Sequence, residues 1–208
     1  MISPIIHSFW FGKNMKSDLL KRCEESWYKI CPDYEIKIWT EDNWDVGKYK
    51  YSQQAYDAKR FAFVCDCCRV DVLYKYGGVS VDGDVEFIKP FTSEILSQRA
   101  FTCKESSGRW ISAVFGSEAN HPWIRKILKY YRNNDFEYNP SKITNTVLID
   151  NINKKLYKET INDIIYLYGD VAIYPRDYFE AKNWSTGKIE ITDNTFCVHH
   201  YQASWLDK

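Results

Sequence analysis

Apolar and polar side chains alternate between Val79 and Phe87, and this alternation predicts a strand. One face carries the apolar residues Val79, Val81, Val85 and Phe87, and the other carries Ser80, Asp82, Asp84 and Glu86. On such a strand Asp82 and Asp84 point the same way, about 7 Å apart. Gly83 between them leaves space for a ligand to approach the backbone.

Two carboxylates that share a face repel each other, and each raises the pKa of the other unless a cation lies nearby. A hard divalent ion that prefers oxygen ligands, Mn²⁺ or Mg²⁺, suits such a pair. An acidic pair on the solvated face of an edge strand would need no ion. The pair alone therefore leaves both interpretations open.

The apolar spacing upstream predicts one amphipathic helix from Ala55 to Tyr76, ended by Gly77-Gly78. Within it, Asp66 and Arg69 are three residues apart and share a face. A carboxylate and a guanidinium in an apolar run are costly to bury unpaired, so they form either a structural ion pair or part of a site. The order of helix, glycine stop and acidic strand favours a place near the mouth of that site.

The rest of the chain alternates between the two periodicities. A strand over Ile5–Phe9, a helix capped by Ser17 and a strand over Tyr34–Trp39 form a βαβ unit, which predicts a parallel sheet and the α/β class. Later segments predict helices at 93–96, 122–131 and 146–156, and strands at 100–103, 110–115, 164–168, 171–174, 187–192 and 195–201. Asn120 or His121, followed by Pro122 in the first turn, is expected to open the helix there, with His121 as a cap or surface residue and not a ligand.

Composition narrows the class of protein further. The chain has 208 residues, 45% of them apolar, which suits one domain over 1–208. Its 28 basic residues balance 28 acidic ones, so bulk charge does not favour nucleic acid as a partner. It lacks a membrane-length apolar run and a signal-like start, and a cytoplasmic location is expected. The seven cysteines lack zinc-site spacing and are expected to pack in the core.

Three patches together resemble a known family. The first is Ala58-x-x-x-Ala62-Phe63-x-x-Asp66-x-x-Arg69-x-Asp71-x-Leu73-Tyr74-x-x-Gly77-Gly78-Val79-x-x-Asp82-x-Asp84-Val85. It resembles the sugar-binding Asp-x-Asp region of family 32 glycosyltransferases, which are bacterial capsule and lipopolysaccharide sugar transferases related to fungal mannosyltransferases and clostridial glucosylating toxins. The opening run from Ile5 to Gly12 and the closing run from His199 to Trp205 resemble the family's two ends.

The resemblance implies a single GT-A type domain, with a mostly parallel, Rossmann-like nucleotide-binding sheet flanked by helices. It implies that Trp10, otherwise a candidate core tryptophan, stacks on the base of a nucleotide sugar, and that Asp66 and Arg69 hold the hydroxyls of the donor sugar. Asp84 would bind the metal directly, and Asp82 would contact the ribose or reach the metal through water.

The closing run adds further expected ligands. Adjacent histidines on a strand face opposite ways, so at most one of His199 and His200 reaches the metal. By its position relative to Ser204-Trp205, His200 is favoured. The resemblance implies that Ser204 and Trp205 donate hydrogen bonds to the diphosphate.

The implied activity is metal-dependent transfer of a sugar, with retention of configuration, from a nucleotide-diphosphate donor such as a UDP-sugar. Asp82, Asp84 and Arg69 would carry catalysis with Mn²⁺ or Mg²⁺, and no enzyme nucleophile is required. The acceptor would be a glycan or lipid-linked oligosaccharide of capsule or lipopolysaccharide biosynthesis. Such an acceptor allows peripheral association with the inner membrane face.

Two positions depart from the family pattern. Ser80 stands where an aromatic is common, and Gly83 stands where the family often has Thr. The loss of a ring at position 80 keeps a non-catalytic nucleotide-sugar or carbohydrate-binding module as an alternative. A haloacid-dehalogenase-like phosphatase also carries Asp-x-Asp, but Glu86 stands where its motif has Thr or Val.

Overall fold

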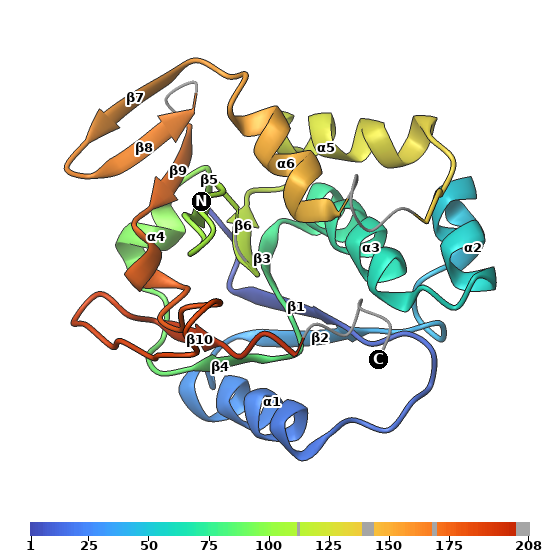
Figure 1. Ribbon diagram of the computed structural model, residues 1–208, viewed down its shortest axis with the longest axis horizontal. Coiled ribbons are helices and arrows are strands. Elements are labelled where there is room, and N and C mark those ends of the chain that lie inside the picture. Colours follow the sequence, from blue (N-terminus) through green and yellow to red (C-terminus); the bar gives the residue numbers. More distant parts are fainter. Residues whose placement is uncertain (112, 139–143, 168–169, 203–208) are drawn as a thin grey trace.

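A mixed sheet with helices on both faces forms the centre of the protein (Figure 1). The computed structural model describes residues 1–111, 113–138, 144–167 and 170–202. The sheet has eight strands in the order β2-β1-β3-β6-β5-β9-β8-β7, and β10 and β4 pair in a separate two-stranded sheet. None of the helices in the described ranges has the length and apolar character that a membrane crossing needs.

The strands of the eight-stranded sheet are β1 (Ile5–Phe9), β2 (Glu35–Trp39), β3 (Gly78–Val81), β5 (Ala100–Cys103), β6 (Val114–Ser117), β7 (Lys158–Ile161), β8 (Ile164–Leu167) and β9 (Val171–Tyr174). The smaller sheet consists of β4 (Val85–Phe87) and β10 (Cys197–His199). The α-helices are α1 (Asp18–Ile30), α2 (Lys50–Asp57), α3 (Phe61–Tyr76), α4 (Ser93–Ser97), α5 (Pro122–Asn133) and α6 (Asn145–Asn153). Two short 3₁₀ helices are η1 (Val46–Lys48) and η2 (Arg176–Tyr178).

The predicted α/β class and the βαβ unit are confirmed. Strand β1 pairs in parallel with both β2 and β3, and β5 pairs in parallel with β9. The pairs β3–β6, β6–β5, β9–β8 and β8–β7 are antiparallel, so the parallel order is concentrated in the first half of the chain. For β7–β8 and β8–β9 the reason is that β8 begins at Ile164, soon after β7 ends at Ile161, and β9 begins at Val171, soon after β8 ends at Leu167, which leaves no room for a parallel crossover.

The predicted start signals of two helices are also confirmed. The Ser17 hydroxyl accepts a hydrogen bond from the backbone N–H of Leu20 at the start of α1. The His121 side chain caps α5 by accepting from the backbone N–H of Trp123, with Pro122 in the first turn.

The expected single helix from Ala55 to Tyr76 is wrong, because the chain forms two helices there. Lys59 adopts a left-handed backbone conformation (φ 57°) between α2 and α3. No glycine or proline marks this break, and the rings of Tyr56 and Phe61 pack edge to face across it. Helix α3 is also not amphipathic, because Lys75 is its only exposed residue.

The expected continuous strand from Val79 to Phe87 is wrong as well. Strand β3 ends at Val81 and β4 begins at Val85, and the backbone N–H of Val85 donates to the carbonyl of Asp82 across a tight turn (3.1 Å). This turn carries the chain from the main sheet to the smaller one. The acidic pair therefore lies on a turn at the end of a buried strand.

Two further strands differ from expectation. Trp110 is not in a strand because side chains of α6 satisfy its backbone: its N–H donates to Asp150 and its carbonyl accepts from the Asn153 amide. Residues 187–192 form no strand: Ile189 makes an isolated bridge with Lys182, and the Gly187 N–H donates to the carbonyl of Asn183.

Two hydrophobic cores stabilise the sheet. One lies among β1, α2, α3, α5 and α6, and the other lies among α1, α4, β3, β4 and β10. The seven cysteines are free thiols, and six of them are buried in these cores, as expected for packing residues. Burial of this apolar surface is the main term that offsets the entropy of ordering the chain.

Candidate active site

The turn between β3 and β4 carries Asp82, Gly83 and Asp84. The backbone N–H of Asp82 donates to the carbonyl of Ala113 (3.2 Å), which fixes the start of the turn against the segment that leads into β6. Asp84 is 8% exposed, so its carboxylate is buried, whereas Asp82 is partly exposed. A rigid strand end therefore presents two carboxylates at one place.

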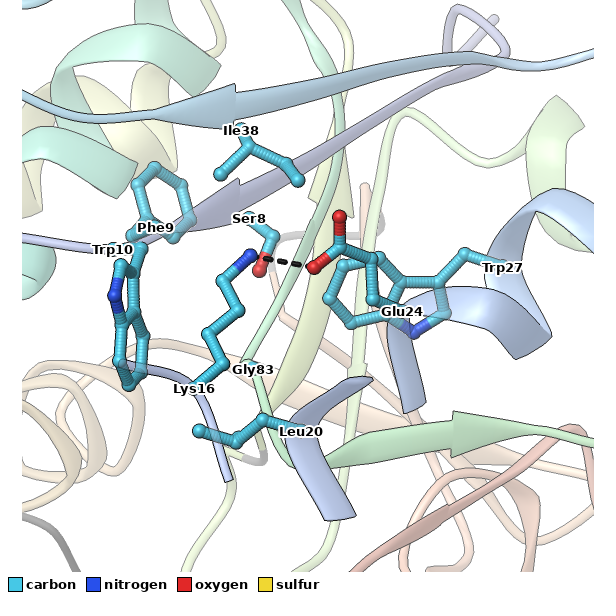
Figure 2. Close-up of a pocket in the computed structure, with 9 residues that line it drawn as sticks. All are labelled: Ser8, Phe9, Trp10, Lys16, Leu20, Glu24, Trp27, Ile38 and Gly83. Carbon is cyan, nitrogen blue, oxygen red and sulfur yellow. Dashed lines mark hydrogen bonds and ion pairs between the residues drawn. The ribbon is translucent and has the colours of Figure 1, made fainter. Parts of the chain in front are cut away.

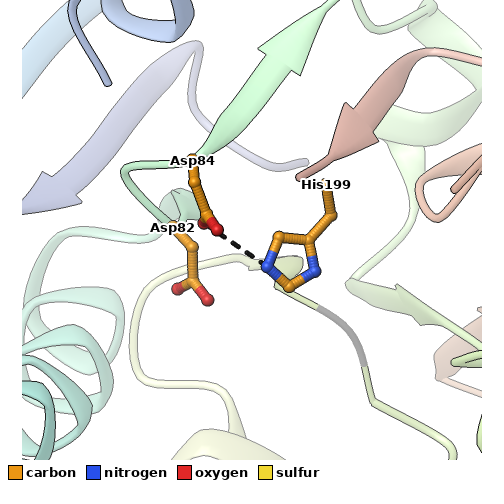
Figure 3. A group of neighbouring side chains, drawn as sticks. All are labelled: Asp82, Asp84 and His199. Atoms are coloured by element: carbon orange, nitrogen blue, oxygen red, sulfur yellow. Dashed lines mark ion pairs between the residues drawn. The ribbon is translucent and has the colours of Figure 1, made fainter. Parts of the chain in front are cut away.

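Strand β10 brings a histidine to this turn. Its antiparallel register with β4 sets His199 opposite Val85, the residue after Asp84. The His199 Nε2 atom lies 3.3 Å from Asp84 Oδ1. One ligand atom from each of Asp82, Asp84 and His199 lies within 4.8 Å of the others. Figure 3 shows the two carboxylates and the imidazole converging from the turn and from β10.

His200 was expected to be the metal ligand, and the structure places it elsewhere. The two histidines face opposite ways, as predicted, but it is His199 that faces Asp84. The His200 ring contacts the Glu86 carboxylate (2.8 Å) on the other side of the strand pair. The cause is the register of β4 with β10, which the order of residues near the end of the chain does not reveal.

Arg69 connects helix α3 to the same turn. Its guanidinium donates to Asp82 Oδ1, and its Nε lies 3.8 Å from Asp66 Oδ1. Arg69 is 7% exposed and lies beside the rings of Phe9 and Phe115. The expected neighbourhood of Asp66 and Arg69 with the acidic pair is therefore confirmed. We name Asp66, Arg69 and Asp82 the Arg69 half-site.

Burial perturbs the charges of the Arg69 half-site. Burial raises the pKa of Asp66 to about 7, and the charge of Asp82 adds to this effect while Arg69 opposes it. Burial would lower the pKa of Arg69, but the carboxylates of Asp82 and Asp66 raise it overall. Perturbed pKa values of this kind occur frequently at functional sites, and structural ion-pair networks produce them too.

A second group of residues surrounds Asp84. Burial would raise the pKa of Asp84, but the charge and hydrogen bond of His199, with the Gln202 N–H, lower it to about 2. The charges of Asp84 and Glu180 raise the pKa of His199 well above its usual range, against the effect of burial. The Gln202 N–H donates to Asp84 Oδ2 (2.6 Å). The residues that follow β10 are thereby held against the turn between β3 and β4.

Glu180 and Tyr201 were not expected from the sequence. Glu180 is fully buried just after η2, and its Oε1 lies 3.4 Å from His199 Nδ1. The Tyr201 hydroxyl donates to Glu180 Oε2, and the Tyr201 ring packs on the His199 ring with centroids 4.0 Å apart. We name Asp84, Glu180, His199 and Tyr201 the His199 half-site. No motif surrounds Glu180, so the sequence offers no signal for it.

Trp10 lies at the end of β1, beside the turn (Figure 2). It lines a small hollow together with Gly83 of the turn and with Lys16 and Glu24. Lys16 Nζ pairs with Glu24 (2.5 Å) and lies 5.8 Å from the centroid of the Trp10 ring. Trp10 is partly exposed, so a flat aromatic surface is available next to the Asp-x-Asp turn.

Three other predicted positions need separate mention. Ser204 and Trp205 lie outside the described residues. Ser80 is fully buried in β3, where it is paired with His7 of β1 and Phe115 of β6. Ser80 therefore belongs to the interior of the sheet.

Comparison with known proteins agrees with this geometry. Residues 17–102, which contain Asp66, Arg69 and the Asp-x-Asp turn, match the family model of the glycosyltransferase sugar-binding region containing DXD motif. The chain is 25% identical over 141 residues to inositol phosphoceramide mannosyltransferase 3 of Schizosaccharomyces pombe, covering 66% of this chain and 39% of that protein. It is 27% identical over 161 residues to Toxin A of Clostridium novyi, covering 77% of this chain and 7% of the toxin.

A solved structure shows the same fold. The PaToxG glycosyltransferase aligns with a TM-score of 0.57 and 21% sequence identity, over 72% of this chain and 67% of that one. The GT-A type fold is thus confirmed. The family match covers the sugar-binding region with the DXD motif, residues 17–102 of this chain. It spans well under half the length of both sequence relatives, 39% of the mannosyltransferase and 7% of the toxin.

Proposed function

We propose that the protein transfers a sugar from a nucleotide-diphosphate donor, such as a UDP-sugar, to a glycan acceptor, with a divalent metal ion at the Asp-x-Asp turn. The observation that carries this proposal is the convergence of Asp82, Asp84 and His199 within 4.8 Å. It stands beside the family match of residues 17–102.

The donor set suits Mn²⁺ or Mg²⁺. Two carboxylate oxygens and one imidazole nitrogen form a hard, oxygen-rich group, and Mn²⁺ accepts a nitrogen ligand more readily than Mg²⁺ does. Within the described residues, His199 is the only ionisable cation in contact with Asp84. A divalent ion held here would supply charge stabilisation to a departing diphosphate.

Side chains of the chain itself would bind and orient the donor. We assign the base to the exposed face of Trp10, because its ring lies next to Gly83 of the turn. We assign the donor-sugar hydroxyls to Asp66 and Arg69, which lie beside Asp82 and offer both acceptors and donors. These contacts would hold the sugar close to the acceptor, and positioning of this kind lowers the barrier without an enzyme nucleophile.

The finer assignments come from the family resemblance. They are retention of anomeric configuration, a capsule or lipopolysaccharide acceptor, and a cytoplasmic location with peripheral association at the inner membrane face. Ser204 and Trp205 would bind the diphosphate. Residues 1–208 would form one catalytic domain.

Metal-dependent hydrolysis of a panel of nucleotide sugars tests the proposal. We expect turnover of at least one donor with Mn²⁺, and loss of turnover in Asp84→Ala. Binding of a nucleotide diphosphate with Mn²⁺ in calorimetry, without turnover of any donor or transfer to any glycan, would instead favour the non-catalytic binding module. Release of phosphate from simple phosphoesters would favour the phosphatase.

A further inference from the structure

We propose that Glu180 is a positioning residue for metal binding, and that its carboxylate keeps the ring proton of His199 on Nδ1 and leaves Nε2 for the ion. This inference rests on the proposed function, which supplies the ion. It assigns a role to a residue outside the Asp-x-Asp motif and outside the matched region 17–102.

The two nitrogens of His199 face different groups. Nε2 lies 3.3 Å from Asp84 Oδ1, and Nδ1 lies 3.4 Å from Glu180 Oε1. Figure 3 shows one ring nitrogen directed at Asp84 and the other on the far side of the ring. A histidine that binds a metal through one nitrogen generally donates the N–H of the other to a carboxylate or carbonyl. The geometry thus matches a line of contacts in space that runs from the Glu180 carboxylate through the His199 ring to the metal position.

Glu180 is itself held firmly. It is fully buried, and its Oε2 accepts from the Tyr201 hydroxyl, while its Oε1 lies within reach of the Ala113 N–H (3.4 Å). Ala113 also binds the turn, because its carbonyl accepts from the Asp82 N–H. Ala113 therefore contacts both the Glu180 carboxylate behind His199 and the backbone of Asp82 in the turn in front of it.

Burial of the Glu180 carboxylate costs free energy if nothing compensates its charge. A carboxylate without solvent must be compensated by charge or by several hydrogen bonds. Among the described residues the only basic side chain in ionic contact with Glu180 is His199, and His199 Nδ1 has no hydrogen-bond partner of good geometry. Hydrogen bonds at functional sites are often long before the ligand binds and shorten afterwards. Ion binding at Nε2 would complete the Nδ1–H···Glu180 contact.

The chain offers a matched control. Glu86 of β4 contacts His200, the residue after β10, at 2.8 Å, and this second carboxylate–histidine pair faces away from the turn. Glu180→Gln and Glu86→Gln therefore remove the same charge from the two pairs. If Glu180 merely contributed charge to the region, the two variants would have similar effects.

The inference is tested by measuring Mn²⁺ binding to the full chain, with the paramagnetic resonance signal of free Mn²⁺ as the readout. We expect Glu180→Gln to weaken Mn²⁺ affinity about 10- to 100-fold, and Glu86→Gln to change it less than about threefold. Thermal unfolding of each variant confirms that it is folded. Equal Mn²⁺ affinity in wild type and Glu180→Gln would overturn the role of Glu180. Failure of the wild type to bind Mn²⁺ would instead overturn the proposed metal site.

A second measurement needs no substitution at Glu180. Long-range ¹H–¹⁵N spectra of the Zn²⁺-loaded wild-type chain, with Zn²⁺ as a diamagnetic substitute, report which nitrogen of His199 carries the proton. We expect protonated Nδ1 and metal-bound Nε2, with the signals assigned by their loss in His199→Gln. The reverse tautomer, or a ring that does not bind the ion, would contradict the inference even if Glu180→Gln does not fold.

Discussion

The two carboxylates of the motif belong to different structural neighbourhoods. In the Arg69 half-site, Asp82 is bound by Arg69, which lies only 13 residues earlier in the sequence. In the His199 half-site, Asp84 is bound by His199 and by the backbone of Gln202, which lies 118 residues later. One tight turn thus joins a locally built ion-pair cluster to a segment from the other end of the chain. Under the proposed function the two half-sites would have separate tasks, with sugar contact at Asp66 and Arg69, metal contact at Asp84 and His199, and Asp82 between them.

The largest expected effect concerns the carboxylate that joins the metal position to β10. Asp84→Asn should lower Mn²⁺-dependent donor hydrolysis by about 10³-fold or more, because charge stabilisation by a metal ion is worth several kcal/mol in the transition state. Steady-state hydrolysis of the best donor measures this. Asp18→Asn, at a fully exposed carboxylate on α1, is the control and should retain activity. Comparable losses in both variants would remove any special role of the turn.

Arg69→Met should have the next largest effect, and this effect should be on folding stability and not on metal binding. It would leave Asp66 and Asp82 without their shared cation, and removal of one partner from a buried pair typically costs about 3–5 kcal/mol. Urea unfolding measures the loss. A double variant that adds Asp66→Asn should recover part of it, because one uncompensated carboxylate is then neutral.

Unchanged stability in Arg69→Met would contradict the view that the Arg69 half-site is a buried cluster. Unchanged stability together with weaker donor binding would show instead that the guanidinium acts on the ligand alone. The two outcomes separate packing from function on this side of the turn.

The two half-sites also differ in how far the sequence predicts them. Asp66 and Arg69 share a helical face at a spacing of three, and the glycines and strand after them set the direction to Asp82, so one continuous stretch contains the information. The identity of the histidine depends on the β4–β10 register, which pairs residues far apart in sequence. Alternation shows that the two histidines face opposite ways but leaves open which one faces Asp84.

Other differences between prediction and structure also lack a signal in the sequence. The break at Lys59 contains no glycine or proline, and the rings of Tyr56 and Phe61 pack against each other across it. The alternation from Val79 to Phe87 resembles one strand because both strands place apolar residues in the same core, although the chain turns between them. Glu180 follows Tyr178-Phe179 and precedes Ala181, and only its burial beside His199 distinguishes it.

Substitution of each histidine sharpens the comparison at the metal position. His199→Ala should weaken Mn²⁺ affinity by about 10- to 100-fold, because it removes a ligand atom from the cluster. His200→Ala should change it less than about threefold, because that ring contacts Glu86. Calorimetric titration with Mn²⁺ measures both. A larger loss in His200→Ala would restore the original expectation for His200 and show that the register changes when the ion binds.

The smallest expected effect is a difference in pH dependence between the two carboxylates. Burial raises the pKa of Asp66 to about 7, above the value of about 4 of an unfolded aspartate, so the folded state binds the proton more tightly. The free energy of unfolding should therefore fall as pH rises from about 4 to about 7, by at most about 1.4 kcal/mol per pH unit. Asp84 has the opposite sign, because its pKa of about 2 lies below the unfolded value. Its contribution is present above about pH 4 and is lost as pH falls toward 2.

Urea unfolding of metal-free protein between pH 3 and pH 8 separates these two contributions. Asp66→Asn should flatten the decline in the free energy of unfolding between pH 4 and pH 7. The substitution removes the buried carboxyl group that loses its proton in this range. Asp84→Asn should leave that decline intact and reduce the loss below pH 4, since its carboxylate is stabilised in the charged form by His199 and the Gln202 N–H. If both variants altered the same pH range, the two carboxylates would titrate as one coupled group. The turn would then unite the half-sites electrostatically, and the division between sugar contact and metal contact would fail.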